Sequence, residues 1–174
     1  MAEGSTYLQS LKTAIATGNV ASKARMAATW FRSIVERAKA VLARDTVFQD
    51  VITDAAASGT LTGRMWLGRM YFFVYNPKHK ATLPYYDMFP LIMLIGFEKE
   101  TFLGLNFHYL NPKLRAILLD RVTAKIGGGI IKWNKIVQIP QVAPTVKRYR
   151  FDHIMRKVIP IEEKEQELAI FLPC

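Results

Sequence analysis

Residues 68–112 read GRMYFFVYNPKHKATLPYYDMFPLIMLIGFEKETFLGLNFHYLNP and carry the strongest structural signal in the chain. They contain three apolar, aromatic-rich runs, at residues 70–75, 89–97 and 102–110, separated by Pro, Asn, Gly and charged residues. Short apolar runs between turn-forming residues are typical of strands. The middle run is far shorter than the ~20 apolar residues of a membrane span, so it predicts a strand buried on both faces.

Large aromatic side chains between closely spaced turns predict a tightly curved barrel. We therefore expect an α+β fold: a small SH3-like β-barrel with an N-terminal helical arm and one or two helices after the barrel strands. The 174 residues are expected to form one domain with an appended arm. The arm would span residues 1–60, and the barrel, with a basic helical insertion, residues 61–174.

The N-terminal region is expected to be mostly helical. Residues 1–18 predict a short helix or a loose end, and residues 21–57 predict two helices, the second capped by Asp45 or Thr46. The apolar stripe of the first of these helices consists of Met26, Trp30, Ile34, Ala38 and Leu42. Residues 1–60 hold seven Lys/Arg and five Asp/Glu. This mixed charge favours a helix that packs on the barrel or on a neighbour over one that contacts DNA.

The segments after the third apolar run continue the pattern. Asn111 predicts a helix cap and Pro112 the first helical position, and the glycines at 127–129 would end that helix. The spacing within residues 146–159 favours a further helix, although a strand is the alternative. The apolar residues 168–172 predict a short strand that closes the barrel.

The positive charge is concentrated in one part of the sequence. The formal net charge is +10, and residues 111–157 hold eleven Lys/Arg against only Asp120 and Asp152, an excess of +9. Aromatic residues are interleaved, as in surfaces that bind phosphates and stack on bases. Without a base-reading motif, binding would be to the DNA backbone or to DNA ends. The candidate DNA-binding residues are Lys113, Arg115, Arg121, Lys125, Lys132, Trp133, Lys135, Lys147, Arg148, Tyr149, Arg150, Arg156 and Lys157.

The sequence offers little for catalysis. The one cysteine, Cys174, cannot form a disulfide within the chain, and His79, His108 and His153 lack metal-site spacing. No GxSxG or GxGxxG motif occurs, and the glycines at 127–129 lack the Gly-Lys-Ser/Thr of a phosphate-binding loop. We expect no catalytic residue, no metal and no cofactor. Since neither a signal peptide nor a membrane span is predicted, we expect a cytosolic protein or one assembled there.

Several strings in the chain resemble a known family. YFFVYNPKHKATLPYYDMFPLIMLIG, FLGLNFHYLNPKLRAILLDRV, KWNKI, KRYRFDHI and the closing ELAIFLPC follow one another as in DNA end protector proteins of T-even-type bacteriophages and cyanophages. LPYYDMFPL and GLNFHYL are the most specific of these strings. The resemblance covers roughly residues 68–174 and leaves out residues 1–60.

The resemblance implies a bacteriophage virion protein, assembled in the host cytoplasm, that binds and protects the genome DNA ends during head completion without catalysis. Lys and Arg would neutralise phosphates, while Trp133 and Tyr149 would stack on a terminal base. The alternative is a phage neck, tail or baseplate protein whose basic surface contacts acidic portal, neck or tail proteins only. In either case an oligomer within the particle is expected. A metal-dependent nuclease is a third reading, which the scarcity of acidic residues disfavours.

Overall fold

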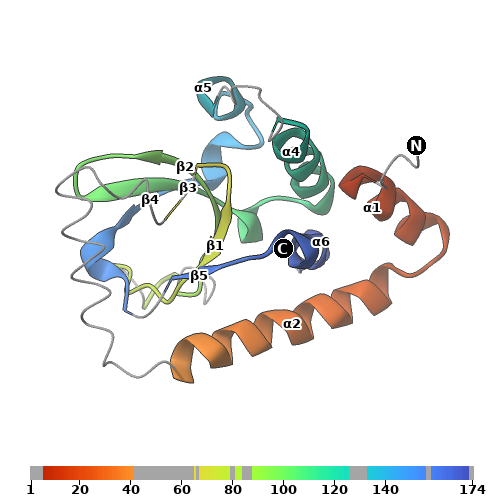
Figure 1. Ribbon diagram of the computed structural model, residues 1–174, viewed down its shortest axis with the longest axis horizontal. Helices are drawn as coiled ribbons and strands as arrows, with labels where there is room; N and C mark the ends of the chain where they lie inside the picture. Colours follow the sequence, from red (N-terminus) through yellow and green to blue (C-terminus); the bar gives the residue numbers. More distant parts are fainter. Residues whose placement is uncertain are drawn as a thin grey trace.

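The computed structural model describes residues 6–40, 65, 67–78, 81–83, 88–125, 133–155 and 158–172. Helices and a sheet share the chain, which confirms the α+β class (Figure 1). The elements in chain order are α1 (Tyr7–Ala16), α2 (Val20–Ala40), β1 (Met70–Phe72), β2 (Leu91–Phe97), β3 (Thr101–Asn106), the 3₁₀ helix η4 (Phe107–Tyr109), α4 (Pro112–Lys125), α5 (Trp133–Ile136), η5 (Ala143–Thr145), β4 (Val146–Arg150), η6 (Phe151–His153), β5 (Ile159–Pro160) and α6 (Glu163–Ile170).

The five described strands form one antiparallel sheet in the order β4-β3-β2-β1-β5. Its three central strands come from the three apolar runs, as the sequence predicts. The sheet is open, with β4 at one edge and β5 at the other. This corrects the expected SH3-like barrel: the residues expected to supply a closing strand belong to helix α6 instead.

Both faces of the sheet are buried, which is why strand β2 is apolar at successive positions. Met70, Phe72 and Leu105 lie on one face and contribute to the larger core cluster, together with residues of α1, α2, α4 and α6. Tyr71 and Phe102 lie on the opposite face, in a smaller and largely aromatic cluster. This alternation follows from the two-residue period of a strand.

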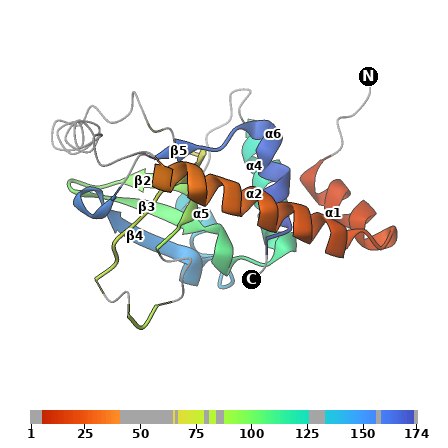
Figure 2. The same cartoon turned by 90° about the horizontal axis from the view of Figure 1, so that it is seen from below.

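The N-terminal helices pack on the same core as the sheet. Helix α1 contacts α4, and α2 contacts α6. The Asp120 carboxylate of α4 accepts the backbone N–H groups of Tyr7 and Leu8, at 2.6 and 3.0 Å, and so caps the start of α1. The Phe31 ring of α2 meets Phe72 of β1 edge to face, with centroids 5.5 Å apart. Helix α2 therefore covers one face of the sheet (Figure 2).

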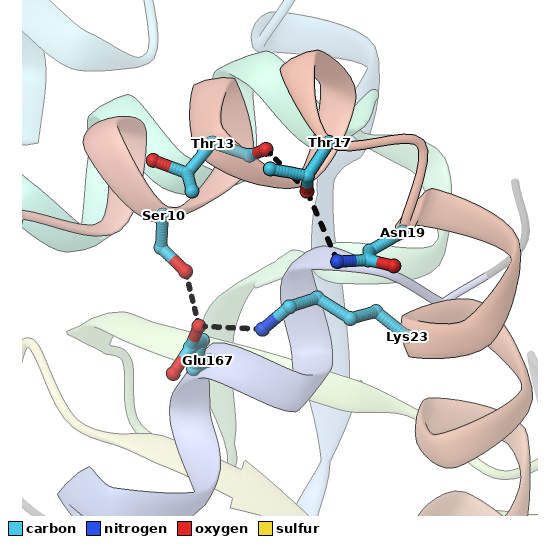
Figure 3. A network of polar contacts seen from close by, with 6 residues as sticks. All are labelled: Ser10, Thr13, Thr17, Asn19, Lys23 and Glu167. Carbon is cyan, nitrogen blue, oxygen red and sulfur yellow. Dashed lines mark hydrogen bonds and ion pairs between the residues drawn. The ribbon is translucent and has the colours of Figure 1, made fainter.

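A small polar network joins α1, α2 and α6. The Glu167 carboxylate accepts the Ser10 hydroxyl and lies 3.3 Å from the Lys23 ammonium (Figure 3). At the turn between α1 and α2, the Asn19 amide donates to the Thr17 hydroxyl at 3.0 Å. The acid side chains of Asp120 and Glu167 thus fix both N-terminal helices to the C-terminal half of the chain.

Two further predictions from the sequence are wrong. Within residues 146–159 a helix was favoured over a strand, but the described residues there form strand β4, helix η6 and the start of β5, so the alternative holds for residues 146–150. Residues 168–172, expected as a strand, contain the end of α6, which begins with a capping box between Glu162 and Glu165. For residues 168–172 the reason is local, because a capped run of polar residues precedes the apolar run and starts a helix.

Other predictions are confirmed in the described part of the chain. The Asn111 side chain caps α4 by accepting the Leu114 N–H at 2.9 Å, with Pro112 at the first helical position. Helix α2 buries Trp30, Ile34 and Ala38, although Met26 points to solvent and is 58% exposed. The predicted second helix of the arm, with its cap at Asp45 or Thr46, lies outside the described residues, as do the glycines at 127–129.

Candidate nucleic-acid interface

The strongest candidate for a phosphate-binding surface lies on the edge strand β4. Arg148 and Arg150, here called the β4 arginine pair, occupy alternate positions of this strand and are both exposed. Arg148 pairs in register with Leu103, whose side chain packs against the larger core cluster. Because directly paired residues project to the same side of an antiparallel sheet, the β4 arginine pair projects to the side that α2 covers.

Each arginine of the pair holds one carboxylate with two contacts. The Nε and Nη2 atoms of Arg148 lie 3.0 and 3.1 Å from the Glu98 oxygens. The same atoms of Arg150 lie 2.9 Å from the Asp152 oxygens. The hydrogen bond from Arg150 lowers the pKa of Asp152 and raises that of Arg150. This two-pronged geometry is the one in which guanidinium groups bind phosphates, so both carboxylates occupy positions suited to phosphate.

The end of β4 is fixed by Tyr75. The backbone N–H of Arg150 donates to the Tyr75 hydroxyl at 3.0 Å, and Tyr75 forms an isolated antiparallel bridge with Ile154. Burial raises the pKa of Tyr75, so the hydroxyl keeps its proton at neutral pH. The strand that carries the arginine pair is therefore paired with β3 along its length and held at its end by Tyr75.

The remaining predicted cations differ in their surroundings. The Lys147 ammonium lies 4.6 Å from the centre of the Tyr109 ring, next to the turn that precedes α4. Lys113 and Arg121 of α4 and Lys135 of α5 are exposed. The structure gives only the backbone of Lys125 and Trp133, and Lys132, Arg156 and Lys157 lie outside the described residues.

Arg115 does not belong to the surface, which corrects its assignment as a DNA-binding residue. Its side chain is fully buried, and its guanidinium donates to the carbonyls of Phe107, at 2.8 Å, and of Ala169, Ile170 and Leu172. Three of these carbonyls lie at or just after the end of α6, where helical carbonyls lack partners within the helix. Arg115 thus closes the C-terminal end of α6 and fixes it to α4.

Tyr149 is also buried, at 4% exposure, so the predicted stacking of its ring on a terminal base is wrong. The ring lies against Phe102 and Phe73 in the smaller core cluster, and its hydroxyl accepts the Asn106 amide at 3.1 Å. Alternation along β4 explains this outcome, because Tyr149 lies between two outward-facing arginines and must project to the opposite side.

Sequence reasoning missed the two acids that bind the β4 arginine pair. Asp152 lies two residues after Arg150, a spacing that predicts no contact in the helix expected there. Glu98 is fifty residues from Arg148 in sequence, and only the pairing of β3 with β4 brings the hairpin at Glu98 beside it. The acids were visible in the sequence, but the strand pairing was not.

The described residues include neither a metal-binding cluster nor a membrane-spanning helix. Across these residues, no three His, Cys, Asp or Glu side chains are grouped as a metal site would require. His108 is buried against Phe31, and burial together with the nearby Arg115 lowers its pKa to about 4. It is therefore neutral at pH 7. Among the helices described, none combines the length and the apolar composition needed to cross a bilayer.

Comparison with protein families matches residues 5–174 to the family described as Phage T4 terminal DNA protecting protein. The chain belongs to this phage family. The match includes α1 and α2, so the expectation that the resemblance leaves out residues 1–60 is wrong. The packing of both helices on the shared core gives a physical reason why the family match extends over them. Comparisons with curated proteins and with solved structures give no match.

Proposed function

We propose that this chain binds the ends of double-stranded phage DNA and shields them from exonuclease without catalysis. The observation that carries the proposal, beside membership of the family, is the β4 arginine pair. Both guanidiniums are exposed, lie on a rigid sheet edge and already hold an oxyanion with two contacts each. Exposed ion pairs of this kind are worth at most about 1 kcal/mol, so a phosphate can replace each carboxylate at low cost.

The cations of α4 and α5, together with Lys147, are further candidate phosphate contacts. Lys113, Arg121 and Lys135 are exposed, and Lys147, which projects to the side of β4 opposite the arginine pair, stands near the turn that leads into α4. Contacts of this type neutralise phosphates and position the protein without reading base sequence. The setting we propose is head completion in the virion, after assembly in the host cytoplasm, with several copies acting together. Lys125, Lys132, Trp133, Arg156 and Lys157 remain candidate DNA contacts.

Digestion of a blunt linear duplex by an exonuclease tests the proposal. The wild-type chain is expected to slow digestion, and the double substitution Arg148→Gln and Arg150→Gln to weaken that protection at least tenfold in protein concentration. Lys12→Gln with Lys164→Gln is the matched control, because both lysines are exposed and belong to helices α1 and α6. Equal protection by wild type and both variants would remove the arginine pair from the DNA contact, and no protection by wild type would refute the function.

A second candidate function follows from the carboxylates that the arginine pair holds. The contacts with Glu98 and Asp152 show that these guanidiniums bind carboxylates. An acidic portal, neck or tail protein could therefore bind the same surface. In that case the chain would be an assembly protein of the particle. Unaltered digestion of free DNA, combined with arginine-dependent co-sedimentation with DNA-free heads, would favour this function over end protection.

A further inference from the structure

The outer face of helix α2 presents arginines that no described carboxylate holds in an ion pair. One side of α2 is buried through Ala27, Trp30 and Ile34, and the opposite side is exposed along the length of the helix. Figure 2 looks onto this outer side, where α2 lies across the sheet and α6. The exposed charged side chains of this face are Arg25, Arg32, Glu36 and Arg37.

The three arginines differ from the β4 arginine pair in one respect. Within the described ranges, no ion pair joins Arg25, Arg32 or Arg37 to an acid, whereas Lys23, Arg148, Arg150 and Lys164 each have an acidic partner. Lys23 of the same helix faces inward and is bound by Glu167. The outward guanidiniums therefore keep their hydrogen-bond donors available to a ligand from solution.

The spacing of these side chains suits an extended anion. Arg25 and Arg32 are seven residues apart, so they lie on one side of the helix at a separation of about 10.5 Å along its axis. Arg37 lies about 7.5 Å further along the axis and, five residues on, roughly 140° around the helix from Arg32, so it flanks that row. Thr29 and Ser33 are also exposed and short, whereas Glu36 is a long acidic side chain one turn from Arg32.

Helix α2 and the β4 arginine pair lie on the same side of the sheet. Phe31 of α2 packs on Phe72 of β1, and Arg148 projects to that side of β4. Strands β1 and β4 are three positions apart in the sheet, which corresponds to roughly 14 Å at the usual strand spacing. Both sets of arginines therefore face away from the same side of the sheet, where one duplex could contact them together.

We propose that the outer face of α2 is a second phosphate-contact surface, which binds the backbone of the same double-stranded DNA as the β4 arginine pair. The proposal rests on the proposed DNA-binding function and extends it to an element that lies outside the basic segment of the sequence. Arginine binds phosphate with two parallel hydrogen bonds, and each contact releases counterions from the DNA. DNA affinity must then depend on these three residues and on salt.

The test measures the affinity for a short blunt duplex by fluorescence anisotropy at several salt concentrations. The triple substitution Arg25→Gln, Arg32→Gln and Arg37→Gln is expected to lower affinity at least tenfold at about 0.1 M salt. It should also reduce the slope of log affinity against log salt by about 2 to 3. The control variant, Lys12→Gln, Lys78→Gln and Lys164→Gln, removes the same net charge from exposed positions on other elements. We expect it to change affinity less than threefold.

The outcomes separate this inference from the function on which it rests. If wild type binds and the triple variant keeps the wild-type salt slope, the α2 surface is refuted while the DNA-binding function stands. If wild type does not bind duplex DNA, both are refuted. If the triple variant binds DNA normally but no longer associates with purified virion proteins, α2 contacts protein and the inference is wrong. Thermal unfolding of all variants should be unchanged, because the substituted side chains are exposed.

Discussion

Arg148 and Arg150 each hold a carboxylate in the position where a phosphate would bind. DNA binding through this pair therefore includes an exchange, in which Glu98 and Asp152 leave and phosphates replace them. The free protein carries its guanidiniums already oriented, which reduces the conformational entropy that binding costs. The same carboxylates compete with DNA, so they set how tightly the surface binds.

The double substitution Glu98→Gln and Asp152→Asn should raise the affinity for a blunt duplex about threefold to tenfold. Each exposed pair is worth at most about 1 kcal/mol, which limits the gain. The control, Glu162→Gln with Glu163→Gln, removes the same charge from exposed sites at the start of α6 and leaves both arginines bound to their acids. Anisotropy titrations of wild type, the double variant and the control measure these affinities. A loss of affinity in the double variant would instead assign the two acids a positioning role.

Arg115 and Arg121 lie six residues apart on α4 and should respond to substitution in opposite ways. Arg115→Leu removes the guanidinium that donates to the carbonyls of Ala169, Ile170 and Leu172, and should lower the free energy of unfolding by about 3 kcal/mol. Arg121→Gln alters an exposed side chain and should leave stability unchanged. Urea unfolding measures both effects.

In DNA binding, the order of the two variants should be the opposite of their order in stability. Folded Arg115→Leu protein should keep the wild-type salt slope, whereas Arg121→Gln should reduce it by about 1, as expected for the loss of one phosphate contact. A salt slope that changes with Arg115 in fully folded protein would contradict its structural role.

At the scale of elements, Glu167 of α6 connects both N-terminal helices to the core. The Ser10 hydroxyl is the main cause that lowers the pKa of Glu167, with Lys23 as a further contributor. A carboxyl whose folded pKa lies below its unfolded pKa stabilises the fold above the unfolded pKa. That stability is lost as the pH falls through the folded value. Contacts of α1 and α2 with α6 should therefore weaken under acid conditions.

Glu167→Gln tests this linkage. At pH 7 the variant should be less stable than wild type, by under about 1 kcal/mol because the carboxylate is partly exposed. The difference should shrink as the pH falls through the lowered pKa of Glu167, where wild type also loses the charge. Glu163→Gln, on the exposed side of the same helix, is the control and should not differ from wild type at either pH. A constant difference across pH would show that the amide itself disrupts packing.

The elements also show how far the sequence predicts the fold. The central strands and the cap of α4 were predictable, because long apolar runs and an Asn-Pro pair give strong local signals. Strand β4 was not, since VKRYR contains one buried residue and only its pairing with β3 makes it a strand. Helix α6 was missed because a short apolar run does not distinguish strand from helix. In that segment the deciding signal was the acidic cap that precedes the run.

At the scale of the whole molecule, the fold redistributes charge that is contiguous in sequence. Arg115 enters the core and Tyr149 turns inward, while Arg148 and Arg150 meet acids from a hairpin and a turn. The arginines of α2 lie within residues 1–60, where the mixed charge of the sequence argues against DNA contact. The sequence predicts that a basic surface exists. Which residues form that surface depends on which side chains each helix or strand buries.

Phosphates occur all along a duplex, so phosphate contacts alone do not distinguish a DNA end from the interior. Any preference for DNA ends must therefore come from the shape of the protein. If α2 and the β4 arginine pair bind one terminus together, the number of chains bound at saturation should follow the number of ends and not the length of the duplex. Blunt duplexes of different lengths but equal end number should therefore bind equal amounts of protein at about 0.15 M salt. The same duplexes closed by hairpin loops should bind less. Quantitative co-sedimentation or mass photometry gives the stoichiometry. Bound protein that rises in proportion to length would mean that the chain coats DNA along its backbone, and end protection would then be a consequence of coating.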